Sequence, residues 1–214
     1  MVPRASPSIA PTEPVTMIHF AQITSEADYA AFKRGYDGQM ARRSGGATRS
    51  VVKVEYLRQA TRPMGCFDAA GRMIAGWVIQ EDQPMLVPMA MPTDVRGRYL
   101  ASVPRAQLCE LTAIWRNDGI SANLFAAVVW PRLVFDCITR GRRHILGIGY
   151  RNTMNEIYGR IAPTLIYNGP SQTIADTEVF VYDYSRRSMV GTLVANLVVR
   201  KLLPLVRRQP AGGP

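Results

Sequence analysis

The chain has 214 residues, of which 47% are hydrophobic, and a formal net charge of +10 at pH 7. This length and apolar content suffice for one sizeable hydrophobic core, so a single folded domain is expected. The positive charge, almost all of it from arginine, indicates either the codon bias of a GC-rich genome or an acidic partner. Its scattered arginines come without zinc-finger spacing or an aromatic RNA-binding signature, which argues against nucleic acid.

Cysteines and histidines are few and widely spaced. They are Cys66, Cys109 and Cys137, with His19 and His144. Their spacing fits neither a disulfide framework nor a metal site, so the sequence predicts no metal and a reducing, cytoplasmic environment. The position of His144, after two arginines at a strand start, favours an exposed structural role over a catalytic one. No uncharged stretch reaches about 18 residues, so no membrane-spanning helix is expected.

The first predicted elements are a tail, a strand and a helix. Residues 1–16 hold four prolines and no signal-length apolar run, which predicts a disordered tail. Residues 17–23 have the pattern of a strand, and Thr24 or Ser25 is expected to cap a helix. The buried face of this helix is predicted to comprise Ala27, Tyr29, Ala30, Phe32 and Tyr36. Residues 42–49 predict a polar loop, and residues 51–57 a further strand or a continuation of that loop.

A hairpin and an insertion come next. Residues 65–67 and 73–79 have strand character and flank a turn-rich connection at residues 68–72. Residues 84–104 contain four prolines and predict an irregular insertion, which either covers an acceptor pocket or forms a long surface loop.

The most informative stretch begins with a strand at residues 109–115. A glycine-bearing turn follows at residues 116–121, and then a helix at residues 123–139 that Pro131 must kink or divide. Such a turn directs backbone N–H groups and the positive end of a helix toward one place, which suits a pyrophosphate or a pantetheine carbonyl. A second strand at residues 144–150 leads into a helical stretch that ends at Pro163. Two more strands are predicted at residues 164–168 and 177–184.

Two motifs in this region resemble those of the GNAT superfamily of N-acyltransferases. Arg-x-x-Gly-x-Ser at residues 116–121 resembles the superfamily's Arg/Gln-x-x-Gly-x-Gly/Ala acyl-CoA loop. Tyr-Gly-Arg-Ile-Ala-Pro at residues 158–163 is similar to its Tyr-x-x-Leu-Gly-Phe. The resemblance covers residues 17–184 and implies an α/β fold, with a mixed, mostly antiparallel sheet flanked by helices.

The departures from these motifs are themselves informative. Ser121 replaces the final Gly/Ala, and Ala162-Pro163 replaces Gly-Phe. In this the chain resembles the divergent long-chain branch, which includes N-acyl amino acid synthases and bacterial ceramide synthases. The Glu-x-x-Arg signature of acyl-homoserine-lactone synthases is missing, because Ala113 stands three residues after Glu110. A quorum-signal synthase is therefore disfavoured.

The resemblance implies transfer of an acyl group from a thioester to an amine, and it assigns candidate residues. Tyr158 would protonate the leaving thiolate, with a half-buried structural tyrosine as the alternative. The residues that would hold the phosphopantetheine of the donor are Arg116, Gly119, Ile120 and Ser121, with Asn152 near the family's usual asparagine.

Glu110 is the candidate general base. The attacking amine must be neutral, so the site needs a base with a pKa near neutrality. The apolar neighbours Cys109 and Leu111 would raise the pKa of Glu110 if its side chain faces a cleft. A solvent-facing strand glutamate is the alternative interpretation.

The leading functional prediction is a long-chain N-acyltransferase. Its donor would be an acyl-CoA or an acyl carrier protein, which is acidic, and its acceptor an amphiphilic amine such as a sphingoid base or an amino acid. The alternatives are a small-molecule acetyltransferase that uses acetyl-CoA, and a non-catalytic GNAT-fold module that binds acyl groups or membranes.

The C-terminal segment, residues 185–214, differs in kind from the rest. Apolar residues recur at helical spacing over residues 189–208, and four basic residues gather toward the end. One interpretation is a core or homodimer helix. The other is a basic amphipathic helix that holds a cytoplasmic protein on the inner, anionic membrane surface.

Overall fold

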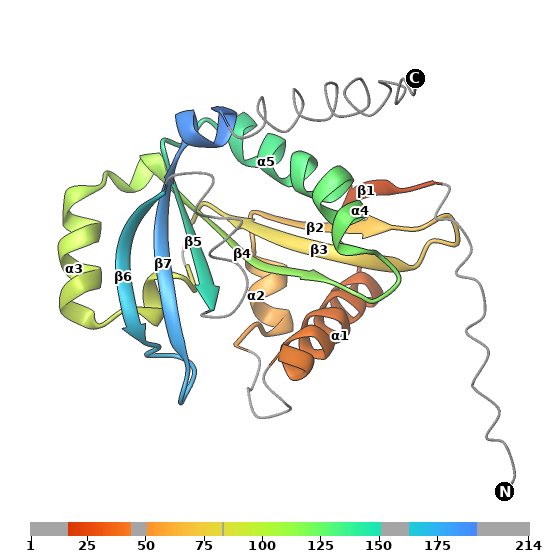
Figure 1. Ribbon diagram of the computed structural model, residues 1–214, viewed down its shortest axis with the longest axis horizontal. Helices are drawn as coiled ribbons and strands as arrows, with labels where there is room; N and C mark the ends of the chain where they lie inside the picture. Colours follow the sequence, from red (N-terminus) through yellow and green to blue (C-terminus); the bar gives the residue numbers. More distant parts are fainter. Residues whose placement is uncertain (1–16, 44–50, 83, 151–162, 192–214) are drawn as a thin grey trace, which may run out of the picture.

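The structure is a computed structural model that describes residues 17–43, 51–82, 84–150 and 163–191. Its centre is one seven-stranded sheet in the order β1-β2-β3-β4-β5-β7-β6 (Figure 1). Every neighbouring pair is antiparallel except β4 and β5, which are parallel. The strands are β1 His19–Gln22, β2 Arg62–Phe67, β3 Met73–Gln80, β4 Leu108–Arg116, β5 His144–Tyr150, β6 Thr164–Pro170 and β7 Glu178–Ser185. The predicted mixed, mostly antiparallel α/β fold is confirmed.

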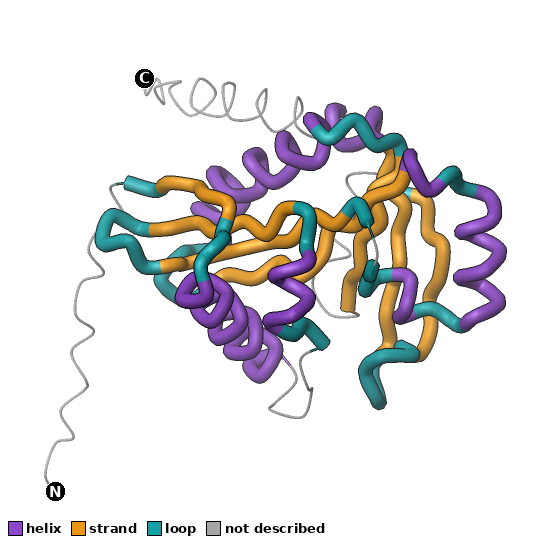
Figure 2. The backbone as a smooth tube through the Cα atoms, turned by 180° about the vertical axis from the view of Figure 1, so that it is seen from behind, coloured by secondary structure: helices purple, strands orange, loops and turns teal. Residues whose placement is uncertain are grey.

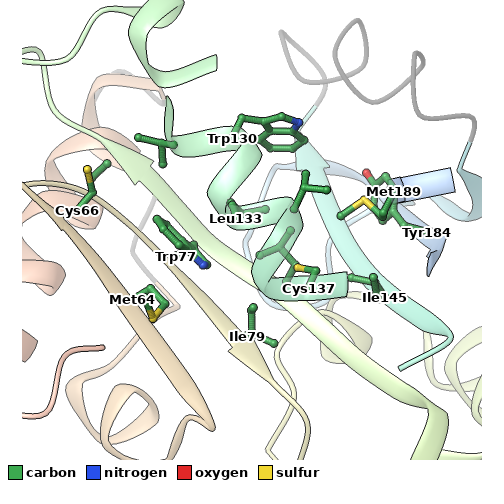
Figure 3. Close-up of a cluster of buried hydrophobic side chains, with 14 of the residues drawn as sticks. Met64, Cys66, Trp77, Ile79, Trp130, Leu133, Cys137, Ile145, Tyr184 and Met189 are labelled. Atoms are coloured by element: carbon green, nitrogen blue, oxygen red, sulfur yellow. The ribbon is translucent and has the colours of Figure 1, made fainter. Parts of the chain in front are cut away.

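One face of the sheet is covered by α5, Trp130–Thr139. Its buried residues pack on side chains from β3, β4 and β5, as the close-up of this cluster shows (Figure 3). Leu133 and Cys137 lie over Trp77 and Ile79, and Met189 closes the cluster beyond β7. This apolar contact fixes α5 across the centre of the sheet.

The opposite face carries two clusters side by side. Helices α1, Glu26–Arg43, and α2, Val54–Gln59, cover the β1–β4 half, as the view from behind shows (Figure 2). The segment from Met85 to Val103 packs on the other half through Leu108, Leu146 and Val181. It contains α3, Thr93–Ser102, with the 3-10 turns Pro88–Ala90 before it and Arg105–Gln107 after it.

Helix α1 begins where the sequence predicts. The Ser25 hydroxyl accepts a hydrogen bond from the Asp28 N–H at 3.1 Å, which identifies Ser25 as the N-cap. Phe32 and Tyr36 are buried as expected, whereas Ala27 is exposed and does not belong to the core face. The helix also extends to Arg43, so residues 42 and 43 are helical, contrary to the prediction of a loop. Residues 44–50 lie outside the described part of the chain.

Two predictions of element type were wrong. Residues 51–57 were expected to be a strand or loop, but α2 occupies most of this stretch. The buried residues of α2, Tyr56 and Leu57, pack in one cluster with α1, as does Val52 just before the helix. These contacts outweigh the strand propensity of the valines. The insertion at residues 84–104 is not irregular throughout, because Pro88 and Pro92 stand at helix starts, where proline is tolerated.

The predicted helix is divided next to Pro131, which lies in the first turn of α5. Helix α4, Ala122–Leu124, continues through a π-helical turn, Phe125–Val129, into α5. The Trp130 N–H bonds to the carbonyl of Phe125, five residues back. The wider turn accommodates a proline that has no N–H and whose ring crowds the preceding turn.

Among the described residues, Ala122–Thr139 is the one helix with the length and hydropathy of a membrane span. A third of this span is buried in the structure, including Val129, Trp130 and Leu133, which pack on the sheet. Of the predicted C-terminal stripe, Met189 is buried in the same cluster and Val190 is exposed. The remainder of that stripe lies outside the described residues, as does the predicted N-terminal tail.

Candidate active site

The parallel strands β4 and β5 separate partway along their length. They pair only from Leu108 opposite His144 to Leu111 opposite Gly147. Beyond that point β4 continues along β3, and β5 continues along β7 (Figure 1). The facing edges of the two strands therefore open into a V, which exposes strand edges to a ligand in the middle of the sheet.

A β-bulge in β4 lies at the start of this separation. Val78 pairs with Thr112 and Gly76 with Trp115, so Trp77 alone faces both Ala113 and Ile114. Ala113 adopts φ +52°, a left-handed conformation that is unfavourable for a residue with a side chain. Because a bulge bends its strand and increases its twist, it turns β4 away from β5.

Glu110 lies at the closed end of the V and is fully buried. One carboxylate oxygen accepts the Tyr56 hydroxyl at 2.7 Å and the Leu86 N–H at 2.8 Å. The other accepts the Val87 N–H at 2.7 Å. Glu110 is thus no solvent-facing strand residue: it joins α2 to the insertion at the boundary between the two clusters of that face.

The environment of Glu110 shifts its pKa toward neutrality. Burial raises the pKa to about 7, although the hydrogen bonds from Leu86, Val87 and Tyr56 act in the opposite direction. A carboxyl group with this pKa can accept a proton near neutral pH.

Tyr56 is a residue of this site that sequence reasoning missed. Its side chain is 6% exposed, and burial together with the neighbouring Glu110 charge raises the pKa of its hydroxyl. It therefore remains a neutral donor to Glu110. No local pattern in the sequence indicated this role, because residues 51–57 were expected to be a strand or loop, whereas Tyr56 lies on α2.

The predicted phosphopantetheine loop is a tight turn between β4 and α4. The Arg116 guanidinium donates to the Ile120 carbonyl at 2.7 Å, and the Gly119 N–H donates to Asn117 Oδ1 at 3.0 Å. Ile120 is fully buried, whereas Gly119 and Ser121 are exposed. The Ser121 hydroxyl caps α4 by accepting the Leu124 N–H at 3.1 Å. Four predicted loop residues therefore form one unit, with the open N–H groups of a helix start at its surface.

A buried glutamine supports the edge of β4 next to this loop. Gln39 of α1 donates to the Ile114 carbonyl at 3.3 Å and accepts the Arg116 N–H at 2.6 Å. These are the two bonds that a residue of an adjacent strand would make, so the side chain replaces the missing β5 partner. Gln39 therefore limits how far along β4 a ligand can pair with the strand edge. Nothing in the sequence singled it out.

The remaining predicted site residues, Tyr158 and Asn152, lie outside the described part of the chain. Within that part, no group of three or more metal-ligating side chains is close enough to hold a metal ion.

His144 lies where β4 and β5 are still paired, at the closed end of the V, and it has a structural role there. Its Nδ1 is 2.7 Å from Asp183 Oδ2, and the same oxygen accepts the Tyr99 hydroxyl at 2.9 Å. This contact ties α3 of the insertion to β5 and β7. The structure thereby supports the structural interpretation of His144.

No protein-family model matches the chain, and no curated protein matches its sequence. Several solved structures are similar. FeeM, an N-acyl amino acid synthase from uncultured soil microbes, aligns with a TM-score of 0.59 and 10% identity, over 80% of this chain and 93% of that one. An N-acetyltransferase from Staphylococcus aureus Mu50 gives 0.55 and 9%, over 80% and 99%. A protein assigned as an acetyltransferase from Salmonella typhimurium, solved with its cofactor acetyl-CoA, gives 0.54 and 9%, over 80% and 95%.

At such identities the similarity establishes the fold and no more. The sheet order, the split between β4 and β5 and these neighbours define the chain as an α/β protein with the fold of acyl-transferring enzymes. That fold is the GNAT fold, as the sequence motifs indicated.

Proposed function

We propose that the protein is an N-acyltransferase that moves an acyl group from a CoA thioester to an amine. The observation that carries the proposal is the V between β4 and β5, with the Glu110 carboxyl at its closed end and the loop 116–121 beyond its open end. The extended pantetheine arm of the thioester fits between the separated strands, because unpaired backbone groups there can form hydrogen bonds with its amide groups.

The proposed reaction is nucleophilic acyl substitution. The neutral amine attacks the thioester carbonyl, and its nitrogen forms a bond to the carbonyl carbon. Backbone N–H groups at the edge of β4 stabilise the oxyanion. The C–S bond then breaks, and the products are an amide and a free thiol.

Two residues are proposed to move the protons. Glu110 accepts the proton of the attacking amine, through Tyr56 or a water molecule because its own oxygens are enclosed. Tyr158 is proposed to supply the proton that the departing thiolate needs.

The finer proposal is a long-chain donor and an amphiphilic acceptor. It is supported by the divergent loop with Ser121 and by the similarity in fold to an N-acyl amino acid synthase. The insertion adds support, because it places apolar side chains, among them Met85, Val87 and Met91, in a cluster next to the backbone that holds Glu110. An amino acid or a sphingoid base would then be the acceptor.

The direct experiment incubates the protein with palmitoyl-CoA and either sphinganine or an amino acid mixture, followed by mass spectrometry. We expect an N-palmitoyl product. Glu110→Gln should form it about 10²–10⁴-fold more slowly. Activity with acetyl-CoA but with no long-chain donor would disprove the finer proposal and leave the N-acyltransferase proposal intact.

A small-molecule acetyltransferase is the second candidate, because one structural neighbour was solved with acetyl-CoA. Thermal-shift titration separates the two: stabilisation by acetyl-CoA equal to that by palmitoyl-CoA would favour this candidate. A non-catalytic acyl-binding module is the third possibility. It would show no product, and its ligand affinity would be the same in Glu110→Gln and Tyr158→Phe.

A further inference from the structure

The outer side of the helix that runs from α4 to α5 is apolar and carries no exposed carboxylate. Residues 122–139 have the hydropathy of a membrane span, yet only a third of them are buried. Phe135 is 51% exposed, and Pro131, four residues earlier on the same side of α5, is half-buried. Asp136 is the one acidic residue of this stretch, and it is buried and paired with two arginines. A surface that approaches this helix therefore meets apolar side chains and no free negative charge.

Cationic side chains border α5 at its C-terminal end. Residues 186–191 form a helical turn after β7, and Met189 of this turn packs in the cluster under α5, so the turn and the helix lie on the same face of the sheet (Figure 3). Arg186 and Arg187 begin the turn, and the Arg186 N–H donates to the Arg143 carbonyl at 3.2 Å. All three arginines are exposed, and none forms an ion pair or a side-chain hydrogen bond with a described residue. Three guanidinium groups are therefore available to an anionic partner.

The carboxylates beside these arginines are already paired. Glu81 is bonded to two arginines just past the end of α5, and Asp183 is bonded to His144. Val190, which is 40% exposed, adds an apolar side chain to the turn. The sequence continues the same pattern, since residues 192–214 include four basic residues and no acidic one. The excess of positive charge therefore extends from the folded body into the segment that follows it.

We propose that this face of the folded body lies on the surface of an anionic lipid bilayer. The contact surface, called here the α5 surface, comprises Pro131, Phe135, Arg143, Arg186, Arg187 and Val190. An apolar helix side bordered by cations is typical of elements that lie in a membrane interface. The guanidinium groups pair with lipid phosphates and carboxylates, while Phe135 enters the boundary between headgroups and acyl chains.

A bilayer suits the α5 surface better than one acidic protein does. Its negative charge extends over a plane, and the cations here are spread from the end of α5 into the following sequence. Each arginine near such a surface strengthens binding about fivefold, so three give roughly a hundredfold. That is less than the marginal binding that a single acyl anchor provides. The α5 surface therefore orients the body on the membrane, and it needs the basic segment after residue 191 for stable attachment.

A fluorescent label at position 135 of the full chain tests this orientation. The native cysteines are all buried, so one introduced cysteine takes the label selectively. We expect the emission of a polarity-sensitive dye on Phe135→Cys to shift to shorter wavelength with vesicles of phosphatidylcholine and phosphatidylserine, but not with phosphatidylcholine alone. Met89→Cys is the matched control, because Met89 is 48% exposed and lies in the insertion, on the opposite face of the sheet. Its label should not respond.

A charge variant of the same labelled chain tests the arginines. Arg186→Gln/Arg187→Gln should weaken binding to the phosphatidylserine vesicles about tenfold or more. The matched control is Arg34→Gln/Arg98→Gln, which removes the same charge from exposed arginines of α1 and α3, on the opposite face. This control should bind as the unsubstituted chain does. Equal weakening in both double variants would overturn the proposal, because net charge alone would then explain the binding.

Three further results would overturn the proposal, each by assigning the α5 surface differently. Sedimentation of the full chain with vesicles but no shift at position 135 would leave the contact to residues 192–214 alone. A label that is shielded without vesicles, and becomes exposed when the chain ends after Gly191, would show that this segment covers α5. A shift with a purified acidic acyl carrier protein, but none with vesicles, would assign the surface to a protein partner.

Discussion

Glu110 combines two properties at the scale of a single residue. It is fully buried, and its carboxylate accepts three hydrogen bonds from α2 and the insertion. Burial disfavours the charged form, whereas the donors favour it, and the outcome is a pKa of about 7. The same group can thus hold two elements together and exchange a proton near neutral pH.

This shifted pKa predicts a pH-dependent stability. The pKa of Glu110 is about 7 in the folded protein, against an ordinary value of 4.5, so between these values the folded state binds more protons than the unfolded state. Its contribution is therefore fully present below pH 4.5 and is lost as the pH rises toward 7, by up to about 3 kcal/mol. Urea unfolding of wild type and Glu110→Gln across this range measures it. A constant difference between the two proteins would contradict the assignment.

We expect Tyr56 to influence the pKa of Glu110, the proposed base. Its hydroxyl lowers the pKa of Glu110, so Tyr56→Phe is expected to raise that pKa further and to cost about 1–2 kcal/mol of stability. In the pH profile of kcat/KM, the limb on which activity increases should move to higher pH. The control is Tyr29→Phe, since Tyr29 lies on α1 and makes no bond to Glu110. If Tyr56→Phe lowers the rate but leaves this limb in place, Tyr56 does not act through Glu110.

At the scale of elements, the packing of α1 against the sheet depends on Gly35, which has no side chain. The Trp115 ring packs directly on Gly35, and Phe32 meets the same ring edge-on, with 5.7 Å between the ring centroids. This contact sets the distance between α1 and β4, and hence the reach of Gln39 to the edge of that strand.

Two alanine variants of α1 should have opposite effects. Gly35→Ala is expected to destabilise the protein by about 1–3 kcal/mol, because the new methyl group overlaps the Trp115 ring. Gly38→Ala should be neutral or stabilising by up to about 1 kcal/mol, because its methyl group meets no close atom and alanine favours the helix. Chemical denaturation of both variants measures these changes in the free energy of unfolding. Equal destabilisation would show that α1 does not pack on Trp115 in this way.

At the scale of the whole molecule, the C-terminal segment bears on whether the protein binds to a membrane surface. The sequence of the C-terminal segment predicts either a membrane-surface helix or a packed one. Met189 belongs to the core under α5, so a truncation must retain it. We therefore compare the full chain with one that ends after Gly191.

We expect anionic liposomes to pellet the full chain but not the truncated form. Each basic residue near an anionic surface contributes about 1 kcal/mol, so binding should weaken with added salt. Neutral liposomes are the control. Equal pelleting of the two forms would remove this segment from membrane binding, and a truncated protein that fails to fold would support a packed helix.

Local patterns were sufficient for much of the architecture. The Ser25 cap, the hairpin of β2 and β3, and the strand β7 each depend on residues close together in sequence, and all three are confirmed. The prediction for residues 51–57 was wrong because their valines favour a strand, whereas the contacts that stabilise α2 come from α1. The prediction for the insertion was wrong for a related reason. Its prolines suggest irregular structure, but Pro88 and Pro92 lie at helix starts.

The sequence by itself determined most of the strands, helix α1, the loop 116–121 and the candidacy of Glu110, because strand periodicity, capping, glycine and charge act locally. Only the tertiary structure decided what surrounds Glu110. Tyr56 and Val87 reach it from 54 and 23 residues away along the chain, and no local pattern specifies such contacts. The bulge at Ala113 and the capping of β4 by Gln39 arise in the same way, from packing between elements distant in sequence.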